Sequence, residues 1–124
     1  MAADSTSIIR DFFRRWGESR AAMMASFDEF MTPDCTWWNV GVATTSGPRE
    51  AAALMEAFTK RIPFDTIRVD ILAICADGDR VFTERVDYML DAQGEQFAEV
   101  PVAGVFDLRG GRIAGWRDYF PPMN

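Results

Sequence analysis

The sequence predicts an α+β fold in which N-terminal helices pack on one face of a curved, mainly antiparallel sheet. Apolar residues recur at helical spacing in the first half of the chain and alternate at strand spacing from Phe64 onward. Turn signals of the Asp-Gly and Gly-Gly type separate the alternating segments, which is typical of successive hairpins. The length of 124 residues fits one domain, which we expect to span residues 1–124.

The first half is expected to contain two helical segments. The first follows Asp4 or Ser5, both suitable N-caps, and runs through SIIRDFFRRWGESRAAMMASFDEFM, where Gly17 bends the helix or splits it in two. A short strand at CTWWNV comes next. The second helical segment, SGPREAAALMEAFTKRI, has Gly47 as its expected N-cap and Pro48 at its first position. Its buried stripe is expected at Ala53, Leu54, Ala57 and Phe58.

The second half predicts a four-stranded antiparallel meander. Its first strand, TIRVDILAIC, is expected to place these residues on one face: Ile67, Val69, Ile71, Ala73 and Cys75. Asp77-Gly78, the segment DAQGEQ and Gly110-Gly111 are the expected turns, and they separate the strands RVFTERVDYML, FAEVPVAGVFDL and RIAGWRDYF. Gly104 and Gly115 fall inside strands, where we expect them to mark bends or bulges that curve the sheet.

Composition limits the kinds of partner. The net charge is −6 and the isoelectric point is about 4.6, so repulsion from phosphates and anionic lipids argues against nucleic acid and membrane partners. The N-terminal residues lack the pattern of a secretory signal and no apolar run approaches the length of a bilayer span, which favours a cytoplasmic protein. Cys35 and Cys75 are too far apart for a zinc motif and are expected to be small buried residues.

The absence of histidine is the most informative count in the sequence. It excludes Ser-His-Asp and Cys-His catalysis, and with them histidine-ligated zinc and iron. Acid–base chemistry is therefore left to Asp, Glu, Tyr, Lys or Cys. A carboxylate-only Mg²⁺ site stays open in principle, but no clustered D-x-D-type loop supports one. We expect no cofactor and no metal.

One predicted strand, RVFTERVDYML, carries charged residues beside apolar ones. Arg85 and Asp87 are two positions apart, so they share a face of the strand with Val81, Thr83 and Met89. Two interpretations are open. The residues form an ion pair on the solvated side of an edge strand, or they are buried for a functional reason, and the pattern favours neither.

Two further strands repeat this arrangement. Asp118 shares a face with Trp116 and Phe120, and Asn39 shares a face with Trp37. Taken singly, Asp118 fits a polar residue near the chain end and Asn39 fits turn chemistry. A strongly bent sheet packed against helices would form a cone with an apolar interior, and polar groups that converge there would favour a ligand site.

These residues resemble a known family. The strand ERVD, the strand VPVAGVFDL and the closing WRDYF are similar to limonene epoxide hydrolase and its relatives, within the broader SnoaL-like, NTF2-like cone fold. The combination of an R-x-D strand with a terminal W-R-D-Y-F is fairly specific, and the resemblance extends over the whole domain. It implies a homodimer that opens an epoxide in one step by an Asp–Arg–Asp arrangement.

The resemblance also implies roles for individual residues. Asp118 would be the base that deprotonates water, Asp87 the acid that protonates the epoxide oxygen, and Arg85 the bridge between them. Asn39 would hold the water. The family's tyrosine lies two residues before that asparagine, where this chain has Trp37, whose N–H donates a hydrogen bond but cannot accept one. Trp37 would hold the water as a donor, or Trp38 or Tyr88 would take over.

The chemistry of epoxide opening fits two carboxylates about one arginine. The ring opens fastest when its oxygen is protonated while water attacks carbon, which requires one carboxylic acid and one carboxylate in the same dry site. An arginine favours ionisation of one carboxyl, and the resulting negative charge raises the proton affinity of the other. Such a pair titrates as a unit.

The leading hypothesis is therefore a cofactor-independent epoxide hydrolase that converts a small hydrophobic epoxide to a vicinal diol. One alternative is a polyketide cyclase or isomerase of the same fold, for which a single carboxylate base suffices. The other is a non-catalytic NTF2-like module that binds a ligand or partner through the cone. The apolar walls that would select the substrate are expected at these positions: Met89, Val100, Val102, Phe106 and Trp116.

Overall fold

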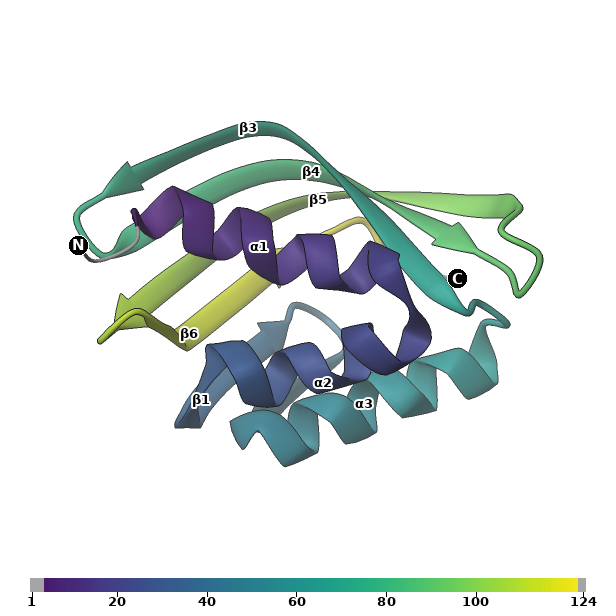
Figure 1. The fold of residues 1–124 in the computed structure, drawn as a ribbon, viewed down its shortest axis with the longest axis horizontal. Coiled ribbons are helices and arrows are strands. Elements are labelled where there is room, and N and C mark those ends of the chain that lie inside the picture. The colour runs from purple at the N-terminus through teal and green to yellow at the C-terminus, as the bar shows by residue number, and fades with distance from the viewer. Residues whose placement is uncertain (1–3, 123–124) are drawn as a thin grey trace.

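Three helices lie against one face of a six-stranded sheet in residues 4–122, the part of the chain that the computed structural model describes (Figure 1). In chain order the elements are α1 (Ser5–Glu18), α2 (Arg20–Phe30), β1 (Met31–Asn39), β2 (Ala43–Ser46), α3 (Gly47–Arg61), β3 (Thr66–Asp77), β4 (Arg80–Leu90), β5 (Gln96–Arg109) and β6 (Arg112–Tyr119). The sheet is strongly bent, and the helices lie within its curve. The predicted fold class is confirmed.

The strands are ordered β2-β1-β6-β5-β4-β3 in the sheet. The predicted meander forms β3 to β6, and every pair in it is antiparallel. β1 pairs in parallel with β6, which adds the first half of the chain to the sheet. β1 is longer than the predicted strand because it begins at Met31, before Pro33, and β2 was not predicted.

Side-chain caps mark where α1 and α2 begin. The Asp4 side chain accepts a hydrogen bond from the Thr6 backbone N–H and caps α1 as expected. The predicted helix is split in two at Ser19, two residues after Gly17, because the Ser19 hydroxyl caps α2. The N-cap of α3 is Ser46 and not Gly47. Within residues 4–122, no helix combines the length and the apolar character needed to cross a membrane.

The buried residues of β3 and α3 differ in part from the predicted ones. In β3 the register shifts between Ile71 and Ala73, so the face that begins at Ile67 continues at Ile74, and Cys75 is exposed rather than buried. In α3 the predicted Leu54 and Phe58 are partly buried and pack against the core, but the predicted Ala53 and Ala57 are exposed, and the fully buried residues are Ala51 and Met55.

Aromatic rings from both halves of the chain form the centre of the core. Phe12, Phe13 and Trp16 of α1 pack against Trp116 of β6, with ring centroids 5.4 to 6.0 Å apart. Trp116 also stacks on Trp37 of β1 at 4.4 Å and an interplanar angle of 7°. The core therefore joins α1 to the middle of the sheet and fixes β1 beside β6.

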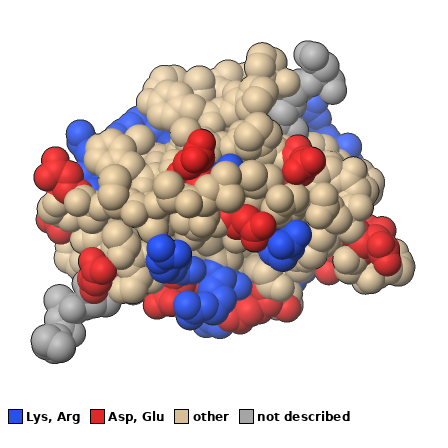
Figure 2. Space-filling model, turned by 90° about the horizontal axis from the view of Figure 1, so that it is seen from above, with Lys and Arg blue, Asp and Glu red and all other residues tan. Residues whose placement is uncertain are grey.

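Charged side chains of both signs are mixed on the surface. Figure 2 shows acidic and basic groups side by side toward one edge of the face seen there, with wide uncharged areas elsewhere. Several of these groups form exposed ion pairs, for example Arg15 with Glu29 at 2.6 Å. Exposed pairs of this kind contribute little to stability. The buried charges described next are a different case.

Candidate active site

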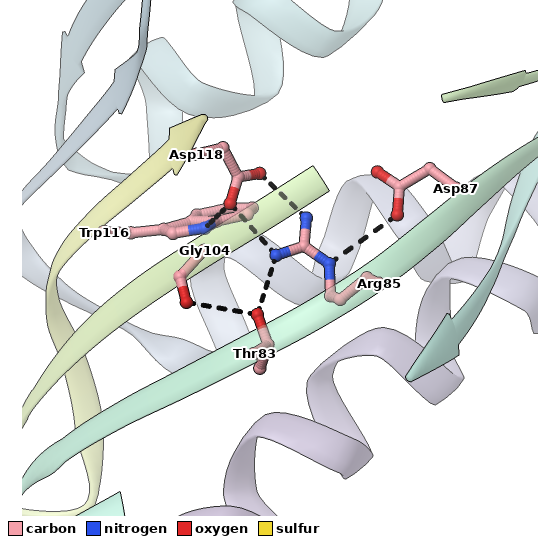
Figure 3. Close-up of polar contacts among 6 residues, drawn as sticks. All are labelled: Thr83, Arg85, Asp87, Gly104, Trp116 and Asp118. Atoms are coloured by element: carbon pink, nitrogen blue, oxygen red, sulfur yellow. Dashed lines mark hydrogen bonds and ion pairs between the residues drawn. The ribbon is translucent and has the colours of Figure 1, made fainter. Parts of the chain in front are cut away.

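Four neighbouring strands bring the predicted polar residues together. Asn39 of β1 lies opposite Asp118 of β6, Asp118 lies opposite Gly104 of β5, and Gly104 lies opposite Thr83 of β4. Arg85 follows Thr83 by two positions, so its side chain is on the same face of β4. Figure 3 shows Arg85 reaching across β5 toward Asp118.

Arg85 and Asp118 form a buried, bidentate ion pair. Nη1 of Arg85 donates to Oδ1 of Asp118 at 3.0 Å, and Nη2 donates to Oδ2 at 2.9 Å. The Trp116 indole N–H donates to the same Oδ1 at 2.7 Å. Three donors on two oxygens suit an ionised carboxylate, which only accepts hydrogen bonds. Oδ2 keeps a lone pair for a further donor.

Two further contacts hold the Nη side and the face of the Arg85 guanidinium. Its Nη1 also donates to the Thr83 hydroxyl at 3.1 Å, and its central carbon lies 4.4 Å from the Phe13 ring centroid, a cation–π contact that α1 supplies. Burial lowers the pKa of Arg85, but the charges of Asp118 and Asp87 outweigh burial and raise the pKa above its ordinary value. Arg85 is therefore a permanent cation inside the core.

Asp87 lies on the other side of this cation and is held loosely. Its Oδ1 is 3.6 Å from Nε of Arg85, an ion pair that is too long for a hydrogen bond (Figure 3). Burial raises the pKa of Asp87 to about 6, with a further contribution from the negative charge of Asp118, while Arg85 acts in the opposite direction. Asp87 therefore accepts a proton far more readily than an ordinary aspartate.

Trp37 and Asn39 provide unpartnered donors beside Asp118. Both side chains are buried, and neither the Trp37 indole N–H nor the Asn39 side-chain amide has a hydrogen-bond partner among residues 4–122. Buried donors without a partner are uncommon, and water or a ligand usually satisfies them. The alternatives to Trp37 lie elsewhere, because Trp38 is exposed beside Tyr119 and Tyr88 packs under Arg68.

A cavity of about 70 Å³ opens between α3 and the concave face of the sheet. Among residues 4–122, the polar side chains that line it are those of Asn39, Asp87 and Asp118, apart from the indole groups of two tryptophans. The apolar lining residues are Trp16, Trp37, Met55, Phe58, Ile62, Phe64, Ile67, Met89, Val100, Val102 and Phe120. A volume of this size has room for several water molecules, since one needs about 10–15 Å³.

The predicted walls are only partly in this lining. Met89, Val100 and Val102 line the cavity, whereas Phe106 and Trp116 are packed into the aromatic core behind it. α3 and the segment after it provide a wall that was not predicted as part of the cavity, although burial of Phe58 was expected: Met55, Phe58, Ile62 and Phe64. Their signal was present in the spacing of Met55 and Phe58, which lie three positions apart on one side of α3.

The Arg85 guanidinium supplies the positive charge that compensates the two carboxylates of this site. Within residues 4–122, no group of three or more His, Cys, Asp or Glu side chains is arranged to hold a metal ion. The arrangement can nevertheless hold one carboxylate and one carboxylic acid in an apolar cavity, on either side of a fixed positive charge.

A known protein family matches most of this chain. A family model described as the limonene-1,2-epoxide hydrolase catalytic domain matches residues 8–124. The curated epoxide hydrolase EphG of Mycobacterium tuberculosis is 38% identical over 93 residues, which are 75% of this chain; the match spans only 59% of that relative.

Two solved structures carry the same fold. An LEH-like epoxide hydrolase of M. tuberculosis has a TM-score of 0.75 at 28% identity, with 97% of this chain and 84% of that chain covered. A SnoaL-like protein of Jannaschia sp. CCS1 has a TM-score of 0.74 at 17% identity, with 94% and 84% covered. The second likeness supports the fold alone.

Proposed function

The chain belongs to the limonene-1,2-epoxide hydrolase family, and we propose that it hydrolyses a small hydrophobic epoxide to a vicinal diol in one step. The observation that carries this proposal is the position of Arg85 between Asp118 and Asp87 at the buried end of an apolar cavity. A cyclase or isomerase of this fold needs one carboxylate base, so it leaves the second carboxyl without a role.

In the proposed reaction Asp118 is the general base. It lines the cavity as a carboxylate, and the free lone pair on Oδ2 accepts a proton from water as the water oxygen attacks an epoxide carbon. Arg85 and Trp116 orient the carboxylate from behind. The attack breaks the carbon–oxygen bond of the ring, and the departing oxygen needs a proton at the same moment.

Asp87 supplies that proton as the general acid. A pKa of about 6 keeps roughly a tenth of Asp87 protonated at pH 7, compared with about a thousandth of an ordinary aspartate. The loose contact with Arg85 leaves its proton available to the cavity. After turnover Asp118 holds the proton taken from water and Asp87 lacks one, and transfer between them or through solvent restores the starting state.

Asn39 and Trp37 would hold the attacking water. Water donates one hydrogen to Asp118 and one to the Asn39 carbonyl oxygen, and it accepts a hydrogen bond from the Trp37 indole N–H. One lone pair then remains for attack on carbon. The buried Trp37 indole N–H, which has no partner among residues 4–122, supports its role as the donor to this water, and the Asn39 side chain lines the same cavity.

The substrate in this proposal is neutral and mainly apolar, because the cavity lining offers no cation and few hydrogen-bonding groups besides the reacting ones. No metal or organic cofactor takes part, since Arg85 supplies the fixed positive charge and the two carboxyls move the protons. Activity is expected to survive exhaustive treatment with a chelator. Loss of turnover that Mg²⁺ or Zn²⁺ restores would contradict this part of the proposal.

Turnover of a panel of cyclic and terminal epoxides in ¹⁸O water, with the diol followed by mass, tests the reaction. The product should carry one ¹⁸O atom. Asp87→Asn and Asp118→Asn should each lower kcat by about 10² to 10⁴. Because the residues act as a unit, the double variant should be little worse than either single one.

Glu84→Gln is the matched control for these substitutions. Glu84 is a carboxylate on β4, the strand that carries Asp87, but its side chain is on the exposed face. This variant should retain the wild-type rate. Melting of each variant shows whether it is folded. Folded Asp87→Asn and Asp118→Asn proteins that turn over an epoxide as fast as Glu84→Gln would overturn the acid–base assignment.

A further inference from the structure

We propose that Thr83 and Gly104 are positioning residues, which together form a seat for the Arg85 guanidinium and thereby set the placement of Asp118 and Asp87. Neither residue lines the cavity, so neither touches the substrate. The kinetic consequences of this inference rest on the proposed function, whereas the seat itself is a matter of geometry.

Gly104 leaves the space through which the ion pair passes. It lies on β5 between Thr83 of β4 and Asp118 of β6, so the Arg85 side chain must cross β5 to reach its partner. An added Cβ at Gly104 would lie inside contact distance of Arg85 Nη1, 2.5 Å from Asp118 Oδ1 and 3.2 Å from Thr83 Oγ1. Any larger residue at this position therefore displaces the ion pair or the strand.

No backbone requirement explains the glycine. Positive φ occurs at six other glycines and not at Gly104, and the pairing of β5 with both neighbours runs through Gly104 without a register shift. The predicted bulge is therefore absent there. Close approach is the remaining reason for glycine inside a strand, and what approaches is the Arg85–Asp118 pair. Bends or bulges were expected at both Gly104 and Gly115. A bulge is wrong for Gly104, whereas the pairing of β5 with β6 does shift in register beside Gly115, between Asp107 and Leu108.

Thr83 fixes the rotation of the guanidinium. Its hydroxyl donates to the Gly104 carbonyl at 3.2 Å and accepts from Arg85 Nη1 at 3.1 Å, so the hydroxyl ties Arg85 to β5. Nη1 thus donates one of its two hydrogens to Thr83 and the other to Asp118. Nε is then left facing Asp87 at 3.6 Å. A rotated guanidinium would change the distance to Asp87 and the bidentate contact to Asp118 together.

A displaced ion pair should reduce kcat more than it changes KM. The atoms that an added Cβ would meet are the ends of side chains, which can move without unfolding the sheet. Misplacement of reacting groups by about 1 Å can cost about 10²-fold in rate. The apolar cavity walls that bind the substrate stay in place, so KM should change little.

The test compares two pairs of variants in the full chain. Gly104→Ala is matched by Gly115→Ala, in a strand at ordinary φ, where an added Cβ would lie 3.5 Å from Asp107 Oδ2 in normal contact. Thr83→Val is matched by Thr83→Ser, which keeps the hydroxyl. We expect Gly104→Ala to lower kcat by about 10²-fold at nearly constant KM, with Gly115→Ala near wild type. Thr83→Val should lower kcat, and Thr83→Ser should recover most of the loss.

Crystal structures of the same variants provide a readout that needs no substrate. In Gly104→Ala we expect at least one of the two Arg85–Asp118 hydrogen bonds to be broken, and in Gly115→Ala both should remain. If Gly104→Ala does not fold, the comparison of Thr83→Val with Thr83→Ser tests the proposed seat instead. Wild-type rates in Gly104→Ala, with both hydrogen bonds intact, would overturn the seat, and so would equal rates in Thr83→Val and Thr83→Ser. A wild-type protein without epoxide turnover would overturn the proposed function, and the crystal structures would still decide on the seat.

Discussion

Asp87 is the residue whose environment sets the pH range of the proposed reaction. Burial raises its pKa to about 6, and the acid must be protonated to act. We therefore expect kcat/KM to fall about tenfold for each pH unit above this pKa. Initial rates across neutral pH check the prediction, with the stability of the enzyme measured at each pH. A rate that stays constant well above this range would show that Asp87 is not the acid in the free enzyme.

The same shift makes Asp87 a cost to stability. Its folded pKa of about 6 lies above the unfolded value of 3.8, so the folded state holds the proton more tightly. Below the unfolded pKa both states are protonated and stability is unaffected, and as pH rises through the folded pKa the folded state carries a penalty of at most about 3 kcal/mol. Asp87→Asn should therefore stabilise the fold above this range and lose the advantage under acidic conditions. Denaturant unfolding of wild type and Asp87→Asn below pH 3.8 and well above pH 6 measures the difference. An equal effect of the substitution at both pH values would contradict the prediction.

At the scale of single elements, strand parity was sufficient to predict which charged groups share a face, and the family resemblance then indicated that they form a site. Arg85 and Asp87 are two apart in a strand with clear turn signals at both ends, so the shared face followed from backbone geometry, and Asp118 followed in the same way. The sequence left open whether that face was buried. Burial depends on α1, which lays Phe13 over Arg85, a contact between residues far apart in the chain.

Where the sequence analysis failed, a tertiary contact or a bulge was responsible. A register shift in β3 moved Cys75 to the surface, and no residue type in that strand marks the shift. β2 is only four residues long and its pairing is with β1, so it carries little alternation of its own. The side of α3 that is buried is decided by packing against β1, which placed Met55 in the cavity. Glycine inside a strand has several causes, and for Gly104 only the positions of Arg85 and Asp118 distinguish them.

At the scale of the whole molecule, charge is separated into two environments. The chain has a net charge of −6, and its surface carries charges of both signs, many of them in exposed ion pairs (Figure 2). The Arg85–Asp118 pair is enclosed by the aromatic core, with side chains 0% and 7% exposed. Salt screens the charges on the surface strongly and those of the buried pair weakly. The two can therefore be distinguished by ionic strength.

The proposed chemistry should be almost independent of salt. A neutral epoxide gains nothing from the surface field, and the buried charges that act on it are shielded from mobile ions. Between about 0.01 M and about 0.15 M NaCl the Debye length falls from about 30 Å to about 8 Å, and we expect kcat/KM to change by less than about twofold.

An epoxide that carries a carboxylate is the control substrate for this prediction. The net charge of −6 should repel it at low salt, so its kcat/KM should rise as salt is added. Rates for both substrates over the same salt series provide the measurement. A several-fold change for the neutral epoxide would show that surface charge contributes to its capture or that the ion pair is open to solvent. A preference for the anionic epoxide at low salt would place a cation at the cavity mouth, where the lining has none.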